Sequence, residues 1–223
     1  VEWISYEVSM LFISMLNLPC VLGAHGIAIS FTTSVFMLTL GTTASMHTYI
    51  GNAVGEGSVY KSQKIMIAGL FINTIVACFN SFLMIFCGKS ISNFFINDDE
   101  TASVLQNMLM IYGFAHLVDT YANGIGGVLR IIGKEKEVLT AFFLCYFGLG
   151  SNSQWIFGLW FGFGYIAIWL STAAAMFLMG FIVIKKIWVL DWRKEVDLVK
   201  NGMEGHSKEG KETGDYVELV EMS

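Results

Sequence analysis

Long apolar stretches separated by short polar segments make up most of this chain. Four of them cover residues 1–22, 24–46, 65–87 and 102–129, and Pro19 interrupts the first near its far end. A transmembrane helix needs about 20 consecutive, mainly apolar residues to cross the hydrocarbon layer. The pattern therefore predicts four membrane-spanning helices in the first 129 residues.

The part that follows the fourth stretch is harder to divide. VLTAFFLCYFGLG at 138–150 is short for a span, the polar run SNSQ follows at 151–154, and an apolar run extends over 155–184. A hairpin turn near 150–154 would give a short fifth helix and a long sixth. We therefore predict an all-α, polytopic membrane bundle of six transmembrane helices, the fifth of them short.

Basic residues in the loops test this count. They follow the expected second, fourth and sixth helices, whereas the other loops contain only Lys89. Cytoplasmic loops of membrane proteins carry an excess of Lys and Arg. The distribution predicts that these three exits and both chain termini lie in the cytoplasm, and it favours six crossings.

Composition agrees with a membrane protein. Hydrophobic residues make up 55% of the chain and charged residues 14%, against about 45–50% and about 25% in soluble domains. The net charge of −5 comes mostly from the last part of the chain. We expect a transmembrane lobe over 1–187, a charged and largely disordered cytoplasmic tail over 188–223, and no nucleic-acid partner.

Cysteine and histidine spacing gives little sign of metal or cofactor chemistry. The four cysteines and four histidines lie singly, without CxxC, HxxH or HxxxH spacing. We therefore expect no metal site, no disulfide framework and no cofactor. The same scatter disfavours an intramembrane enzyme, which would need a nucleophile–base pair or clustered metal ligands at membrane depth.

Asp119 is the one acid near the middle of the fourth apolar stretch. A charged side chain at that depth costs about 2.5–3.5 kcal/mol on insertion scales. It can be a structural acid paired with a neighbouring helix, or a site that takes up and releases a proton or cation. We favour the second, because intramembrane acids mark functional sites. Asn123, four residues on, shares its helix face and could hydrogen-bond the acid.

Two more acids, Glu2 and Glu7, lie in the first apolar stretch. Five residues apart on a helix, they point about 140° away from each other and cannot form a pair on one face. Glu7 lies deeper and is the better buried candidate. On the third stretch, Asn73 and Asn80 are seven residues apart and could hydrogen-bond neighbouring helices, although a packing role is the safer interpretation.

IGNAVGEGSVYKSQK at 50–64 is interpreted as a glycine-containing loop between helices. A phosphate-binding loop is disfavoured because the Walker spacing and its Gly-Lys-Ser/Thr ending are missing. The chain carries no signal peptide and starts without Met directly in an apolar stretch, which suggests a piece of a longer protein.

Four short motifs, in order along the chain, point to one family. They are VEWISYE at 1–7, IGNAVGEG at 50–57, the segment from Asp119 through GGVLR to Arg130, and GLWFG at 158–162 with LDWRKEV at 190–196. Together they resemble the C-terminal half of multidrug and toxic compound extrusion (MATE) transporters, most closely those of eukaryotes.

The resemblance implies the second of two six-helix lobes, so that an N-terminal lobe or partner half is missing. It also implies export of organic cations in exchange for protons or Na⁺. Glu2, Glu7 and Asp119 would be the coupling acids. Asn52, Gly55, Gly57 and Arg130 would belong to the cytoplasmic loop motifs.

Our hypothesis is alternating access. The ionised Asp119, with Glu2 or Glu7, attracts a cation into an aromatic cavity, and a proton from outside then releases it. Cation–π contacts could contribute about 0.5–2 kcal/mol each, although for any single aromatic residue lipid-facing or core packing is the more common role. The expected cavity residues are Tyr6, Phe36, Met37, Tyr112, Tyr121 and Asn123.

Two alternatives stay open. A lipid-linked oligosaccharide flippase can share this architecture, but its anionic substrate would need Arg or Lys, and only Arg130 is near. An inactive half-transporter is the other. The sequence does not distinguish a plasma membrane from a vacuolar or endosomal location, and the sorting-type pattern Tyr216-Val217-Glu218-Leu219 arises often by chance.

Overall fold

The structure, a computed structural model, describes residues 2–202, with only the backbone described for Glu2. This part of the chain is helical, as expected. The helices are α1 (Glu2–Met15), α2 (Pro19–Gly55), α3 (Val59–Phe86), α4 (Gly88–Phe95), α5 (Asp99–Ile131), α6 (Glu135–Phe143), the π-helical segments η1 (Leu144–Ser151) and η2 (Gln154–Trp160), and α7 (Gly164–Val189). A further helix covers 192–202.

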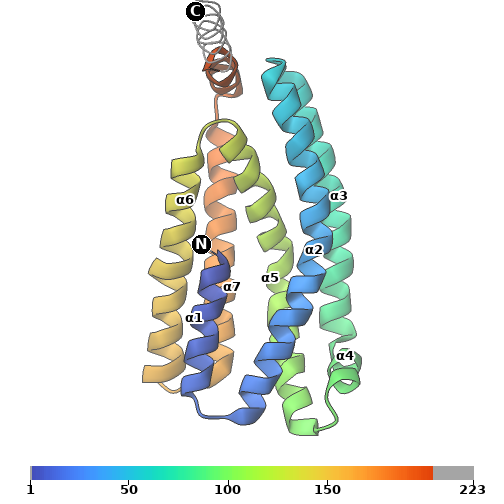
Figure 1. Cartoon of the computed structure of the whole chain (residues 1–223), viewed down its shortest axis with the longest axis vertical. Coiled ribbons are helices and arrows are strands. Elements are labelled where there is room, and N and C mark those ends of the chain that lie inside the picture. The colour runs from blue at the N-terminus through green and yellow to red at the C-terminus, as the bar shows by residue number, and fades with distance from the viewer. Residues whose placement is uncertain (1, 203–223) are drawn as a thin grey trace, which may run out of the picture.

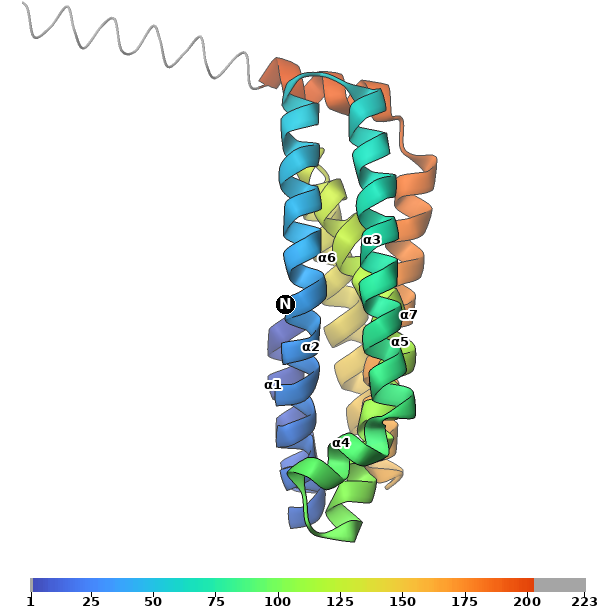
Figure 2. The same ribbon diagram turned by 90° about the vertical axis from the view of Figure 1, so that its right-hand side faces the viewer.

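The long helices lie side by side along one axis and form an elongated bundle (Figures 1 and 2). Six helical rods compose it between residues 2 and 202: α1, α2, α3, α5, the segment 135–160 and α7. The short helix α4 lies at one end. Helix α5 packs against α2, α3 and α7, so it is the central helix of the bundle. The six-helix lobe is confirmed.

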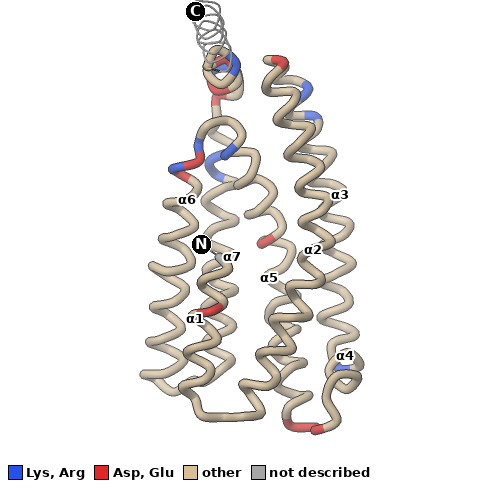
Figure 3. Tube along the Cα trace, in the orientation of Figure 1, with Lys and Arg blue, Asp and Glu red and all other residues tan. Residues whose placement is uncertain are grey.

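The outer surface of the bundle is apolar. Within the described residues, α2, α3 and α7 are long and apolar enough to cross a membrane. Large side chains on α3 are exposed, among them Phe71, Phe79 and Phe86. Figure 3 shows most of the Lys and Arg positions at the end of the bundle where α6 begins. An apolar surface bounded by charged ends fits a bundle that spans a bilayer.

The first two helices divide differently from the prediction. Helix α1 ends at Met15, and Pro19 is the first residue of α2, so the boundaries 1–22 and 24–46 were wrong. Proline lacks a backbone N–H, and the first residue of a helix needs none because that N–H has no partner within the helix. Pro19 therefore starts a helix and does not interrupt one.

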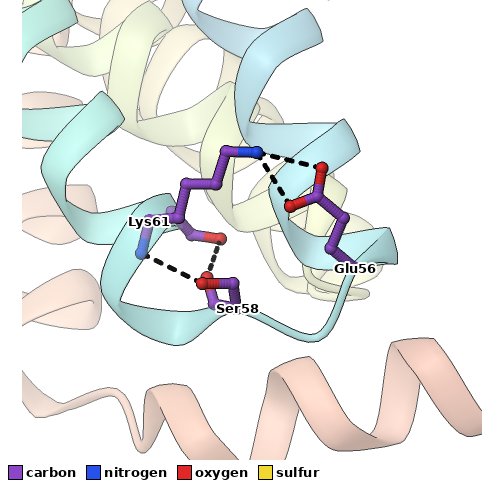
Figure 4. A network of polar contacts seen from close by, with 4 residues as sticks. Glu56, Ser58 and Lys61 are labelled. Atoms are coloured by element: carbon purple, nitrogen blue, oxygen red, sulfur yellow. Dashed lines mark hydrogen bonds and ion pairs between the residues drawn. The ribbon is translucent and has the colours of Figure 1, made fainter.

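The expected loop at 50–64 is also mostly helical, because α2 continues to Gly55 and α3 begins at Val59. The short connection is fixed by Ser58, whose Oγ accepts a hydrogen bond from the Lys61 backbone N–H at 3.4 Å. Lys61 Nζ also contacts Glu56 Oε2 at 2.8 Å (Figure 4). Both charged side chains are about half exposed, so the ion pair adds little stability.

The fifth rod shows why the position of the last turn was predicted wrongly. Helix α6 is short, but the winding continues through η1 and η2 to Trp160, and the chain turns at 161–163, not at 150–154. Gly162 and Gly164 have positive φ angles of 73° and 70°, which suit glycine at a tight turn. The polar run SNSQ lies inside the rod.

Those polar side chains find partners within the bundle. Asn152 Nδ2 donates to the carbonyl oxygens of Phe147 and Gly148 at 3.0 and 2.8 Å. Gln154 is fully buried. Because their hydrogen bonds are satisfied by protein, these residues need no aqueous turn.

The start of α5 is fixed by a side-chain cap. Asp98 accepts hydrogen bonds from the Thr101 hydroxyl at 2.6 Å and from the Thr101 backbone N–H at 2.9 Å. These two hydrogen bonds lower the pKa of Asp98 below its ordinary value, and the bond from the Thr101 hydroxyl group has the larger effect. An acid at this position also favours the positive end of the helix dipole.

The helix at 192–202 runs crosswise beside the ends of α2 and α3 (Figures 1 and 2). Trp192 and Val196 are buried, and Lys134 Nζ pairs with Glu195 Oε1 at 2.9 Å. Residues 203–223, which are most of the expected tail and include Tyr216-Val217-Glu218-Leu219, lie outside the described residues.

Reversing the Lys134 charge should weaken the attachment of this helix. The hydrogen bond to Glu195 raises the pKa of Lys134. The stability that this ion pair contributes is therefore fully present below the ordinary lysine pKa, and it is lost only as the pH rises through the raised pKa. At neutral pH, Lys134→Glu should therefore speed amide hydrogen exchange over 192–202 by about twofold to fivefold.

Hydrogen exchange read by mass spectrometry checks this. The double variant Lys134→Glu/Glu195→Lys should restore the protection. Lys186→Glu, which breaks the separate ion pair with Glu137, is the matched control and should leave 192–202 unchanged. Equal exchange in all variants would contradict an attachment through this pair.

Candidate functional site

Asp119 is fully buried on α5, the central helix. The small residues that follow it let α2 approach closely. The ring of His47 lies so near Gly127 that a Cβ there would be 2.0 Å from it, and His47 Nε2 is 2.8 Å from the carbonyl oxygen of Gly124. The glycines of this stretch therefore serve helix packing beside the acid.

Three polar side chains contact the Asp119 carboxyl group. Asn123 Nδ2 donates to Oδ1 at 3.1 Å, which confirms the hydrogen bond expected from the spacing of four residues. The hydroxyl groups of Tyr112 and Tyr146 lie 3.5 Å from Oδ2 and Oδ1, at the long end of the hydrogen-bond range. The acid is thus held by its own helix and by the fifth rod.

Tyr146 was not identified from the sequence. It is buried in η1, and its ring stacks on Phe142 with the ring centroids 5.8 Å apart. π-Helical segments occur often at functional sites, because the wider turn changes the direction of the side chains. In the sequence this tyrosine is one aromatic residue in an apolar run, so no local signal marks it.

Three of the predicted cavity residues come together. Tyr6 on α1, Phe36 on α2 and Tyr112 on α5 line one small cleft of about 20 Å³, which is partly open to the surface. Trp3 and Thr32 complete much of its wall. Tyr112 lines the cleft and also contacts Asp119. It therefore connects the aromatic cleft to the buried acid.

The other predicted cavity residues lie elsewhere. Met37 is 45% exposed and does not line this cleft. The Tyr121 hydroxyl lies 2.5 Å from Thr74 Oγ1 on α3, and Asn123 contacts Asp119. Glu7 is exposed on α1, and the side chain of Glu2 is not described. Of the three predicted acids, Asp119 is the one whose buried surroundings the structure describes.

The predicted loop-motif residues form helix ends. Gly57 has a φ of 76°, and a Cβ there would lie 2.9 Å from Lys200 Cδ of the crosswise helix. The carbonyl oxygen of Asn52 accepts the Glu56 N–H, Gly55 ends α2, and Arg130 lies in the last turn of α5. A basic side chain there interacts favourably with the negative end of the helix dipole. These positions shape the end of the bundle.

Buried polar groups also connect the helices away from Asp119. Asn73 Nδ2 donates to Thr43 Oγ1 at 2.9 Å, and Asn80 Nδ2 donates to the Val35 carbonyl oxygen at 3.2 Å. Both asparagines therefore hydrogen-bond α2, whereas a packing role was the interpretation favoured from the sequence. Within residues 2–202, no group of three or more His, Cys, Asp or Glu residues is arranged to hold a metal ion.

Removing the Asn123 amide should destabilise the lobe most when residue 119 is an aspartate, because its carboxyl group then loses a hydrogen-bond donor. Loss of a partner from a buried polar group costs about 1–3 kcal/mol. Asn123→Ala should therefore lower the thermal unfolding temperature by a few degrees, and by less in an Asp119→Asn background.

Thermal unfolding in detergent, as a double-mutant cycle, measures this coupling. Asn107→Ala removes a different partly buried hydrogen bond of α5, to Tyr165, and is the control that should cost the same in both backgrounds. A cost of Asn123→Ala that is independent of residue 119 would contradict the coupling.

The MatE family profile matches residues 1–156. Multidrug and toxin extrusion protein 1 of Danio rerio is 30% identical, over 92% of this chain and 35% of that protein. Its Homo sapiens counterpart is 26% identical, over 86% and 34%. The chain thus spans about a third of the length of these relatives.

The fold has a solved counterpart. The crystal structure of the eukaryotic MATE transporter AtDTX14 superposes with a TM-score of 0.83, at 14% identity, over 90% of this chain and 45% of that one. At this identity the likeness concerns the fold alone.

Proposed function

This chain belongs to the MATE family, and we propose on that basis that it is the C-terminal six-helix lobe of a secondary antiporter, one that exports organic cations or other xenobiotics in exchange for protons or Na⁺. The observation that carries the proposal is the connection through Tyr112, which lines an aromatic cleft and contacts the buried Asp119 carboxyl group.

The cleft suits a cationic, partly apolar solute. Its lining residues are Trp3, Tyr6, Ile29, Thr32, Thr33, Phe36 and Tyr112. Aromatic faces attract organic cations with about 0.5–2 kcal/mol each. The ionised Asp119 adds a long-range attraction that is strong because the surroundings are apolar. Neither Lys nor Arg occurs in this lining, which disfavours the alternative of a flippase for anionic lipid-linked sugars.

Exchange follows from the cost of burying a charge. An apolar environment disfavours an ionised carboxyl group, so Asp119 gains by binding either a cationic solute or a coupling ion. A proton that arrives from outside neutralises the acid and releases the solute. The two lobes then rock about a site near the midplane. Glu2 and Glu7 remain candidates for a second coupling acid, and an N-terminal lobe or partner half would supply the opposite wall.

Asp119→Asn should abolish exchange while leaving the fold intact. The amide is close in size to the carboxyl group but cannot ionise. We expect proton-driven uptake of a fluorescent organic cation into vesicles to fall at least about tenfold, the size of effect that 1.4 kcal/mol of lost coupling produces.

Asp98→Asn is the matched control, because asparagine also caps helices well and Asp98 lies outside the cleft at the start of α5. Its transport should equal that of the natural protein. Undiminished uptake by Asp119→Asn would remove this acid from the mechanism.

The basic end of the bundle should face the cytoplasm. In a variant whose four cysteines are replaced by alanine or serine, Lys61→Cys should react with a membrane-impermeant thiol reagent only after permeabilisation. Asn97→Cys, at the opposite end beside the start of α5, should react in intact cells. The reverse labelling pattern would contradict the orientation that the positive-inside rule gives.

A further inference from the structure

A second, smaller pocket shares a wall with the aromatic cleft. It lies among α1, α2 and α7, and we call it the His25 pocket. Tyr6 and Ile29 line both this pocket and the cleft, so the two spaces adjoin. The residues on its other sides are Ser9, His25, Trp169 and Thr172.

Two buried polar groups in this pocket have no partner among the described residues. His25 is 1% exposed, and neither of its ring nitrogens makes a hydrogen bond. Trp169 is 5% exposed, and its Nε1 likewise makes none. The two rings meet edge to face, with their centroids 5.5 Å apart. Folded proteins leave few buried polar groups unpaired, so each such group calls for an explanation.

The hydroxyl groups of the same pocket are held in place by a hydrogen-bonded chain. Ser9 Oγ donates to Gln154 Oε1 at 3.1 Å, and Gln154 Nε2 donates to Thr172 Oγ1 at 2.9 Å. The fully buried Gln154 thereby fixes α1 and α7 around the pocket. Its wall is preorganised, as a binding site requires, and the free hydrogen-bonding capacity is concentrated at His25 and Trp169.

The chemistry of these two groups defines what they can bind. A neutral imidazole offers one N–H donor and one nitrogen acceptor, and an indole offers one donor. None of the lining residues is Asp, Glu, Lys or Arg, so a charged group would find no permanently charged counterion there. A hydroxyl group accepts from the indole and both donates to and accepts from the imidazole, so it matches the pair.

We propose that the His25 pocket is a subsite that binds a hydroxyl group of a solute whose cationic part lies in the aromatic cleft. This rests on the proposed function, because it assumes that the cleft holds an organic cation. Because Tyr6 and Ile29 line both spaces, the subsite directly adjoins the aromatic cleft. The subsite therefore makes the protein prefer cations that carry a hydroxyl group a short distance from their charge.

A matched pair of probe cations tests the subsite. Triethyl(2-hydroxyethyl)ammonium and triethylpropylammonium have the same charge and nearly the same shape, and they differ by a hydroxyl in place of a methyl group. Isothermal titration calorimetry with the full protein in detergent should show the hydroxylated cation binding more tightly, by up to about tenfold, the range that one net hydrogen bond supplies.

The variants assign this preference to the two rings. His25→Phe and Trp169→Phe keep an aromatic ring but remove the polar atoms, and each should reduce the affinity ratio of the two cations to near one. His25→Gln keeps a donor and an acceptor and should retain most of the preference. Trp160→Phe, at an exposed tryptophan near the turn before α7, is the matched control and should change nothing.

The possible outcomes separate the two proposals. Equal affinities in the natural protein, as expected if the pocket holds only water, would overturn the subsite. So would a failure of both cations to bind, or a preference that survives both phenylalanine variants. A hydroxyl preference that depends on His25, in a protein that shows no proton-driven uptake, would support the subsite and overturn the antiport mechanism. If His25→Phe does not fold, Trp169→Phe still decides the matter.

Discussion

The burial of one carboxyl group on the central helix constrains the rest of this lobe. Asp119 is fully buried on α5, which packs against α2, α3 and α7. A buried acid needs hydrogen-bond donors when it is ionised, and here they come from Asn123, Tyr112 and Tyr146. Because one donor belongs to the fifth rod, a change in the charge of Asp119 alters a contact between two helices.

Part of this arrangement follows from the sequence, because it depends on short-range spacing or on bulk hydrophobicity. The lengths of the apolar stretches predicted the six rods of the bundle. The spacing of four residues along a helix predicted the contact between Asp119 and Asn123. Tyr6, Phe36 and Tyr112, which lie on three different helices, line one small cleft. The contact between Asp119 and Asn123 is predictable because a helix fixes the relative directions of side chains four residues apart.

The prediction of the last turn was wrong because polar side chains can be hydrogen-bonded either by water in a turn or by protein groups inside the bundle. Ser151 to Gln154 look like an aqueous turn, yet Asn152 bonds to the carbonyl oxygens of its own helix and Gln154 bonds to Thr172 across the bundle. Local sequence does not reveal the partner of Gln154, which lies on another helix. Tyr146 was missed for the same reason, since its contact with Asp119 spans 27 residues along the chain and the wide turns of η1.

The division of polar groups along one wall suggests how such a lobe could accept many solutes and still discriminate among them. Aromatic rings in the cleft offer attraction with little directional demand, so they tolerate different shapes. In the mechanism that we propose, Asp119 adds a selection for positive charge that acts over a longer range. His25 and Trp169 offer directional hydrogen bonds, and they lie in an adjoining, smaller space. Hydrogen-bonding groups discriminate strongly, because an unmatched solute leaves them unpaired. Placing the two functions in adjoining spaces lets charge and hydrogen bonding be recognised independently.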